Sequence, residues 1–159
     1  MIKREGFSLI ELLISIVIIG ILTSIAISSY KIYKTSARNS VALYDLKSLI
    51  NDELAYYSIN QRFASFSTED VTQNGIIRVD GFEHKYLSKD IRAVAKVNRS
   101  YANFCTKHTY GDKIYAYQTE NDMIYWKKSS IGHPLQDEDC PDATPNNDFV
   151  GWHTLAQKQ

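Results

Sequence analysis

Glu11 is the first residue of the chain that could do chemistry, because it is the only charged side chain in a long apolar stretch. From Phe7 to Tyr30 no other Asp, Glu, Lys or Arg occurs. A carboxylate inside a membrane span costs roughly 3 kcal/mol even on mild insertion scales, and such groups are usually paired and functional. The sequence therefore predicts a positive partner for Glu11.

The two cysteines, Cys105 and Cys140, are the next candidates. In an exported domain they would form one disulfide, whereas in the cytosol they would stay reduced. The compartment therefore decides the state of the thiols, and the N-terminus decides the compartment.

Other reactive residue types lack the spacing that a catalytic or metal site needs. Cys105 and His108 would point to opposite faces of a strand, which argues against a Cys–His nucleophile. The remaining histidines are scattered, and the acidic residues near the C-terminus lack the spacing of a calcium loop. We expect no enzyme activity, no cofactor and no metal. The scattered histidines are His84, His133 and His153, and the acidic residues near the C-terminus are Asp137, Glu138, Asp139 and Asp142.

The charge balance argues against nucleic acid as an obligatory partner. Lys and Arg total 18, as do Asp and Glu, so no global basic field exists to attract phosphates. One local basic and aromatic patch is present, which we interpret as either an ordinary sheet edge or a contact for single-stranded DNA. It consists of Tyr125, Trp126, Lys127 and Lys128.

The N-terminal segment has the length and polarity of a membrane anchor. The apolar run of 24 residues to Tyr30 would span about 36 Å as a helix, against roughly 30 Å for a bilayer core. Lys3 and Arg4 precede it, so the positive-inside rule places the N-terminus in the cytoplasm. A secretory signal fits less well, because its apolar region is shorter. A plain anchor would leave Glu11 unexplained.

The stretch Gly6-Phe7-Ser8-Leu9-Ile10-Glu11-Leu12 resembles the class III signal of type IV pilins and pseudopilins. The resemblance covers residues 1–30. It implies that a prepilin peptidase cleaves between Gly6 and Phe7 and methylates the new N-terminal Phe7. It also makes Glu11 the characteristic glutamate of the motif. Ser28 stands near the position where pilins usually carry a proline, which leaves open whether the helix melts on assembly.

Cleavage would supply the positive partner, because it creates an ammonium group on Phe7. In a filament this ammonium can neutralise Glu11 of a neighbouring subunit. An incorrect axial offset between the two subunits would leave both charges buried without a partner. A pair within one subunit is the alternative. Glu11 is therefore expected to be the assembly residue.

The rest of the chain predicts an α+β head. Helical spacing continues beyond Tyr30 and predicts one helix over about 7–58, with Asp45 and Glu53 on its polar side. Turn-prone residues follow, with a short strand near 76–80. Alternation then predicts an antiparallel meander of about four strands (91–97, 103–110, 113–119 and 123–129) with one face on the helix and one largely wet. The apolar helix positions are Val41, Tyr44, Leu46, Leu49, Ile50, Leu54 and Tyr57.

Three regions follow from these elements: a leader (1–6), a transmembrane and filament-core helix (7–30) and a periplasmic or extracellular head (31–159). The tail after residue 130 is turn-rich and shows no strand or helix periodicity. A Cys105–Cys140 bond would close a loop over it, which resembles the disulfide-bounded region of type IV pilins and favours a pilus over a secretion pseudopilin.

The resulting hypothesis is a structural pilin subunit. The resemblance implies a single-pass inner-membrane precursor and an extracellular homo-oligomeric helical filament. Its partners would be the prepilin peptidase and the inner-membrane assembly platform and ATPase. The alternatives are a pseudopilin of a type II secretion system and a minor tip pilin that acts as an adhesin or DNA-binding module. Adhesion, twitching, DNA uptake, secretion and conduction all remain open.

Overall fold

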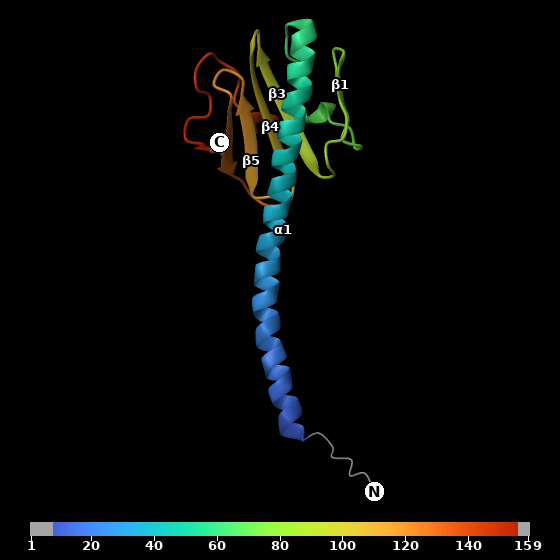
Figure 1. Cartoon of the computed structure of the whole chain (residues 1–159), viewed down its shortest axis with the longest axis vertical. Helices are drawn as coiled ribbons and strands as arrows, with labels where there is room; N and C mark the ends of the chain where they lie inside the picture. Colours follow the sequence, from blue (N-terminus) through green and yellow to red (C-terminus); the bar gives the residue numbers. More distant parts are fainter. Residues whose placement is uncertain (1–7, 156–159) are drawn as a thin grey trace. The chain divides into compact units, whose positions relative to one another are not determined.

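The computed structural model describes residues 8–155, and these residues belong to two compact units that divide after Lys34. One helix, α1 (Leu9–Asn60, 52 residues), contributes to both (Figure 1). Its bounds lie within two residues of the predicted ones at each end.

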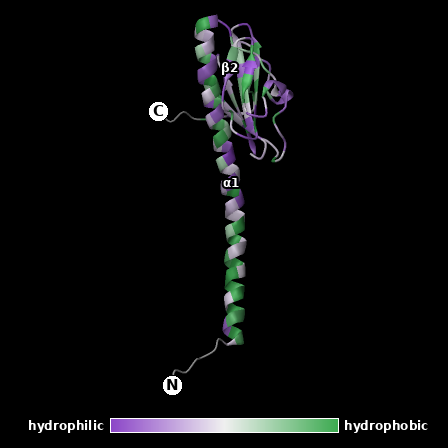
Figure 2. Ribbon diagram, turned by 90° about the vertical axis from the view of Figure 1, so that its right-hand side faces the viewer, coloured by the Kyte–Doolittle hydropathy of each residue, from purple (hydrophilic) through white to green (hydrophobic). Residues whose placement is uncertain are grey.

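The first unit is the apolar part of α1, from Leu9 to Lys34. Hydrophobic side chains follow one another along this part of the helix (Figure 2), and all of them are exposed. By length and composition the segment could cross a membrane. Ser28 Oγ donates to the carbonyl of Ser24 (3.3 Å), a bond of the kind that bends helices slightly.

The second unit is the head, in which part of α1 packs on an antiparallel sheet (Figure 1). The sheet has the order β3-β4-β5-β6-β7, so strands that are neighbours in sequence are paired. Its first four strands are the four predicted from alternation. They are β3 (Ile91–Asn98), β4 (Tyr101–His108), β5 (Lys113–Gln118) and β6 (Met123–Lys128).

Two smaller elements complete the head. The hairpin β1 (Ile77–Val79) and β2 (Phe82–His84) forms a separate two-stranded sheet, where a short strand was expected. The tail adds β7 (His153–Thr154) to the edge of β6, although the sequence of the tail shows no strand periodicity. Two residues are too few to show a periodic pattern. The 3₁₀ helices are η1 (Thr68–Asp70) and η2 (Asp137–Asp139).

The main core lies between α1 and one face of the sheet. Leu46 and Leu49 are fully buried, and they belong to the same cluster as Phe104, Tyr115 and Tyr117 of the strands. Removal of this apolar surface from water is the dominant favourable term in folding. A buried hydrogen bond also joins the layers, since Thr106 Oγ1 of β4 donates to the carbonyl of Ala42 (2.9 Å).

The helix face differs from the predicted one at several positions. Tyr44 is 71% exposed, and Val41 and Leu54 are also exposed, although their spacing placed them in the apolar stripe. Asp45 and Glu53, assigned to the polar side, are buried. Their spacing explains this, because Asp45 and Glu53 each lie four residues from a buried apolar position, Leu49, and so share its face.

The second face of the sheet is covered by the tail, so the prediction of a largely wet face is wrong. Leu135, Phe149 and Cys140 of the tail are buried in a second cluster with strand residues, and Trp152 packs against it. Each apolar tail residue is isolated among turn residues, so no periodicity revealed it. The strand members of this cluster are Val94, Cys105, Ile114, Ala116 and Tyr125.

The turn between β4 and β5 ties the sheet to α1. The backbone N–H of Asp112 donates to Oδ1 of Asn39 (3.1 Å), and a Cβ at Gly111 would lie 2.6 Å from the same oxygen. A side chain at residue 111 would therefore displace the Asn39 side chain from this contact, so a glycine in the turn keeps the bond between Asn39 and Asp112 in place.

Candidate functional site

Glu11 lies in the first turn of α1, where its carboxylate bonds to its own helix. The backbone N–H of Ser8 donates to Glu11 Oε2 (2.9 Å), and the backbone N–H of Glu11 donates to the carbonyl of Ser8 (3.1 Å). This contact is half of a capping box, in which an acidic side chain satisfies a free N–H group at the start of a helix. Gly6 and Phe7 lie outside the described residues, so the pairing of Glu11 with Phe7 stays a prediction.

The apolar part of α1 offers a long surface for association. Its large side chains are all more than half exposed, and they surround the helix. Contiguous apolar surface of this extent marks a membrane or protein interface, because soluble monomers rarely expose it. Glu11 is the only acidic side chain in it. The residues are Leu9, Ile10, Leu12, Leu13, Ile14, Ile16, Val17, Ile18, Ile19, Ile21, Leu22, Ile25 and Ile27.

The predicted Cys105–Cys140 disulfide is present in the structure, with the two Cα atoms 5.8 Å apart. Cys105 lies in β4 on the tail side of the sheet, and Cys140 directly follows η2. Both are buried. His108 lies on the other side, where its Nδ1 accepts the backbone N–H of Tyr110 (3.1 Å). The disulfide therefore cross-links the tail to the middle of the sheet.

Buried polar groups hold the two ends of the tail. Near its start, Nζ of Lys107 donates to the carbonyls of Ser130 (2.9 Å) and His133. Burial lowers the pKa of this lysine below its ordinary value. Near its end, Asp148 accepts Nδ2 of the buried Asn103 (2.8 Å) and the backbone N–H of Thr144 (2.9 Å). No sequence pattern marks these anchors, because their partners are distant in sequence.

Glu53, like Asp45, lies on the buried side of α1 and not on the predicted polar side. It is fully buried, and its Oε2 accepts the backbone N–H of Ala64 (3.0 Å). Burial raises the pKa of its carboxyl group to about 7, and the nearby charge of Asp52 adds to the shift. Asp52 itself contacts Nδ1 of the buried His84 (2.6 Å).

The acidic residues of the tail have local structural partners. Asp137 Oδ1 accepts the backbone N–H of Thr68 (2.9 Å), and Asp139 Oδ2 accepts that of Gln136 (3.0 Å). Within residues 8–155 no group of three or more His, Cys, Asp or Glu side chains could hold a metal ion.

The predicted basic and aromatic patch does not form one surface. Lys127 Nζ lies 4.6 Å from the ring centroid of Trp152, which packs on the tail side. Trp126 instead packs against the cluster on the helix side, where Lys113 Nζ is 4.0 Å from its ring centroid. Neighbouring strand residues point to opposite faces, which divides the patch between the two sides of the edge.

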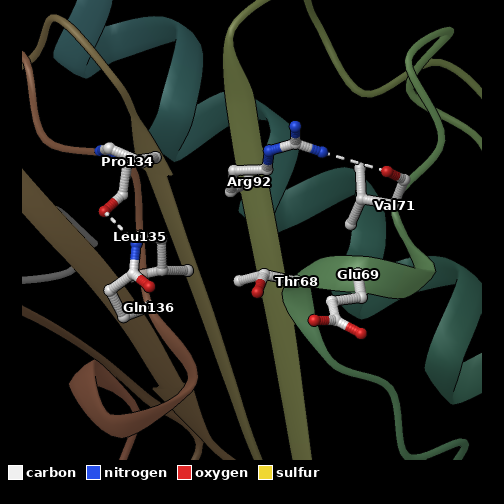
Figure 3. Close-up of a pocket in the computed structure, with 7 residues that line it drawn as sticks. All are labelled: Thr68, Glu69, Val71, Arg92, Pro134, Leu135 and Gln136. Carbon is white, nitrogen blue, oxygen red and sulfur yellow. Dashed lines mark hydrogen bonds between the residues drawn. The ribbon is translucent and has the colours of Figure 1, made fainter.

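Figure 3 shows a cavity of about 380 Å³ between η1 and the tail. Arg92 of β3 lies at its centre, and its Nη1 donates to the carbonyl of Val71 (3.0 Å). On the other side of the cavity from Val71, Nε2 of Gln136 donates to the carbonyl of Pro134 (3.4 Å). The groups drawn are suited to polar contacts rather than to nucleophilic chemistry.

Comparison with known proteins agrees with the N-terminal motif. Residues 1–27 match the model of the prokaryotic N-terminal methylation motif. The chain is 36% identical over 67 residues to the type IV major pilin protein PilA of Myxococcus xanthus (strain DK1622), which is 42% of this chain and 30% of that protein. It is 36% identical over 81 residues to the fimbrial protein EcpB of Eikenella corrodens, 49% of this chain and 46% of that protein.

In each comparison the chain spans less than half the length of the relative. Three observations nevertheless point the same way: the methylation motif in residues 1–27, the long helix packed on an antiparallel sheet in this chain, and relatives named as pilin and fimbrial proteins. Together they support the type IV pilin family for this chain.

Proposed function

We propose that the chain is a structural subunit of a type IV pilus-like filament, cleaved after Gly6 and polymerised through the apolar part of α1. The observation that carries the proposal is the exposed apolar helix with Glu11 as its single acidic residue. The methylation motif in residues 1–27 supports processing by a prepilin peptidase. A structural role requires no catalytic residue.

The contact between Glu11 and Ser8 indicates how one carboxylate serves two states. In the precursor, Glu11 Oε2 accepts the backbone N–H of Ser8 and caps the helix. Cleavage after Gly6 would leave Phe7 as an ammonium group one residue away from this cap. When a neighbouring subunit docks, its Phe7 ammonium would meet the Glu11 carboxylate in apolar surroundings, where an unpaired charge is costly.

The location and the partners follow from this proposal. Lys3 and Arg4 would stay in the cytoplasm and the head would lie outside, so the precursor is a single-pass protein of the inner membrane. An assembly platform and its ATPase would move subunits into the filament. The disulfide suits a head that works in an oxidising compartment, and its resemblance to the disulfide-bounded region of type IV pilins favours a pilus over a secretion pseudopilin.

Two substitutions at Glu11 separate capping from charge pairing. Glu11→Ala removes both, whereas Glu11→Gln keeps an oxygen that can accept the N–H of Ser8 but has no charge. We expect both variants to insert into the membrane and to be cleaved. We also expect both to yield far fewer surface filaments, because neither can neutralise the ammonium of a neighbour.

The measurement is the amount of sheared filament, together with a mass spectrum of the N-terminus, which should show methylated Phe7. Normal filaments from Glu11→Gln would refute charge pairing and leave capping as the role of Glu11. Recovery of Met1 on the mature wild-type protein would refute processing and favour a simple anchor.

A further inference from the structure

The segment of α1 directly after the apolar run carries aromatic and basic side chains. Tyr30, Lys31, Tyr33 and Lys34 are all exposed, the two tyrosines by 63% and 73%. They belong to the same compact unit as the apolar run. At about 3.6 residues per turn, the four side chains lie within about 160° of the helix circumference. They therefore form one continuous surface, which we call the collar.

The collar carries two positive charges that the protein leaves without an acidic partner. Neither lysine forms an ion pair within residues 8–155. In the sequence no Asp or Glu occurs between Glu11 and Asp45, so the adjacent turns of the helix are not acidic either. Nζ of Lys34 lies 5.7 Å from the ring centroid of Tyr30, which leaves the ammonium at the surface. The collar is therefore suited to an anionic partner.

The collar also continues the apolar surface of α1 without a gap. Its partner must therefore accept a hydrophobic helix and, directly beside it, two cations. A phospholipid bilayer has both parts, since its hydrocarbon core is bordered by phosphate groups. Tyrosine rings are enriched at this border, and lysine stems extend along apolar surface while the ammonium reaches the headgroups. Anionic lipids attract each such lysine further.

The distance between the collar and Glu11 matches the thickness of a bilayer core. The 20 residues from Glu11 to Lys31 correspond to about 30 Å of helix. The hydrocarbon core of a bilayer is about 30 Å thick. When Lys31 is level with the phosphates on one side, the carboxylate of Glu11 therefore reaches the opposite boundary, where water can hydrate it.

We propose that the collar binds the phosphate groups of anionic phospholipids, in the leaflet where α1 leaves the membrane toward the head, and that this contact fixes the depth of the helix. The ammonium groups of Lys31 and Lys34 donate to phosphate oxygens, and the rings of Tyr30 and Tyr33 lie among the headgroups. Glu11 is then held at the opposite boundary, so the precursor does not bury an unpaired carboxylate. This inference rests on the membrane insertion of α1, which belongs to the proposed function.

The test uses the isotope-labelled full chain in dodecyl maltoside micelles, titrated with dioctanoyl phosphatidylglycerol. We expect saturable shifts of the backbone amide signals of Lys31 and Lys34. Dioctanoyl phosphatidylcholine has the same chains and phosphate but a compensating positive charge. It should bind at least about fivefold more weakly, the usual contribution of one lysine at an anionic surface. Inorganic phosphate should also bind more weakly, because it cannot use the apolar surface beside the collar.

A double variant with Lys31→Gln and Lys34→Gln should lose the preference for phosphatidylglycerol, because it removes both charges and keeps good helix formers. The matched control combines Lys47→Gln with Lys128→Gln, which removes two exposed charges from the head and should keep the preference. Both double variants should stay in vesicles during extraction at high pH, since the apolar run is unchanged.

A water-soluble gadolinium chelate measures the depth of the helix in nanodiscs that contain phosphatidylglycerol. In the wild type it should broaden the amide signals of Glu11 and Lys34 and spare those of residues 13–27. In the collar double variant the helix is free to shift along its axis. The broadening at Glu11 and at Lys34 should then change in opposite directions, and an unchanged profile would refute the role of the collar in setting depth.

Four further results would overturn the proposal. Equal binding of the phosphatidylcholine would show that the collar does not recognise negative charge. An equal loss in the head control would make net charge the cause. Binding of inorganic phosphate as tight as that of the lipid would indicate a site for free anions, and tighter binding of a single-stranded oligonucleotide would assign the collar to nucleic acid.

Failure of the proposed function gives a different result. Release of the wild-type protein from vesicles at high pH would refute the membrane anchor itself. Retention in vesicles without any preference between the two lipids would refute the collar alone.

Discussion

Replacement of Cys105 and Cys140 by alanine, singly and together, measures what the disulfide contributes to the head. The bond joins residues 35 apart in sequence, and both cysteines are buried between β4 and the tail. Any single replacement breaks the bond, so the three variants lose the same cross-link. They differ only in which buried sulfur atoms they also remove.

The magnitude follows from the length of the closed loop. For a loop of about 35 residues, the entropy estimate gives a loss of about 4 kcal/mol in the free energy of unfolding at 25 °C. Lys107, Asn103 and Asp148 still hold the tail in the variants, so the native state should keep its fold. The double variant should therefore lose about as much as each single variant, and not twice as much. The coupling energy of the double-mutant cycle should be about 4 kcal/mol.

Tryptophan fluorescence in guanidinium chloride is a suitable assay. Trp126 and Trp152 both lie in the head, and they are the only tryptophans of the chain, so the signal reports the unfolding of this unit alone. The dependence on denaturant should also steepen without the bond, because the unfolded chain exposes more surface. Non-reducing mass spectrometry of the wild type verifies that the bond is present at the start.

Two results would refute this reasoning. If the losses of the single variants add up in the double variant, the cost comes from the missing sulfur atoms and not from the cross-link. If each of the three variants loses less than about 1 kcal/mol, the cross-link contributes little because the tail is already restrained in the unfolded ensemble, and the loop estimate does not apply.

Two further predictions concern the carboxylates of Glu53 and Asp148. The pKa of Glu53 rises from 4.5 to about 7 on folding, so the folded state binds this proton more tightly and stability is lost as the pH rises from about 4.5 to about 7, by about 3 kcal/mol in total. Glu53→Gln should remove this slope from urea unfolding measured against pH, and an unchanged slope would contradict the assignment. Asp148→Ala should cost about 2 kcal/mol, because it leaves the buried Asn103 without its carboxylate partner, whereas Asp142→Ala, at an exposed position, should cost less than about 0.5 kcal/mol in the same denaturation assay. Equal losses at Asp142 and Asp148 would show that the contact with Asn103 is not what stabilises the tail.

Much of the head could be predicted, because its elements carry periodic patterns. The helix lacks proline and glycine over a long range, and the four strands of the meander alternate clearly. The turn at Gly111 was also visible, since it contains a glycine followed by Asp112. Local patterns of this kind reflect the geometry of a single element, so they can be read without knowledge of its neighbours.

The structure of the tail could not be predicted from local sequence patterns. Leu135, Phe149 and Trp152 are separated by turn residues, yet they cover the second face of the sheet. The two residues of β7 form a strand only because β6 offers an unpaired edge. Neither feature has a local signature, because each depends on a partner distant in sequence.

The polar residues of α1 make the same point within a single helix. Asp45 and Glu53 are buried where they satisfy backbone groups of Ser88 and Ala64, whereas Tyr44 is exposed. Hydropathy assigned them to the wrong sides, because it scores a residue by type and not by the groups it meets. Spacing from Leu49 would have been the better guide.

By itself, the sequence determined the processing motif, the apolar helix with Glu11 in its first turn, and the order of the strands. These properties depend on residues close together in the chain. The tertiary structure alone decided which polar groups are buried and how the tail covers the sheet. Those properties depend on contacts between distant segments, and the energy of such a contact exists only once the backbone has brought both partners together.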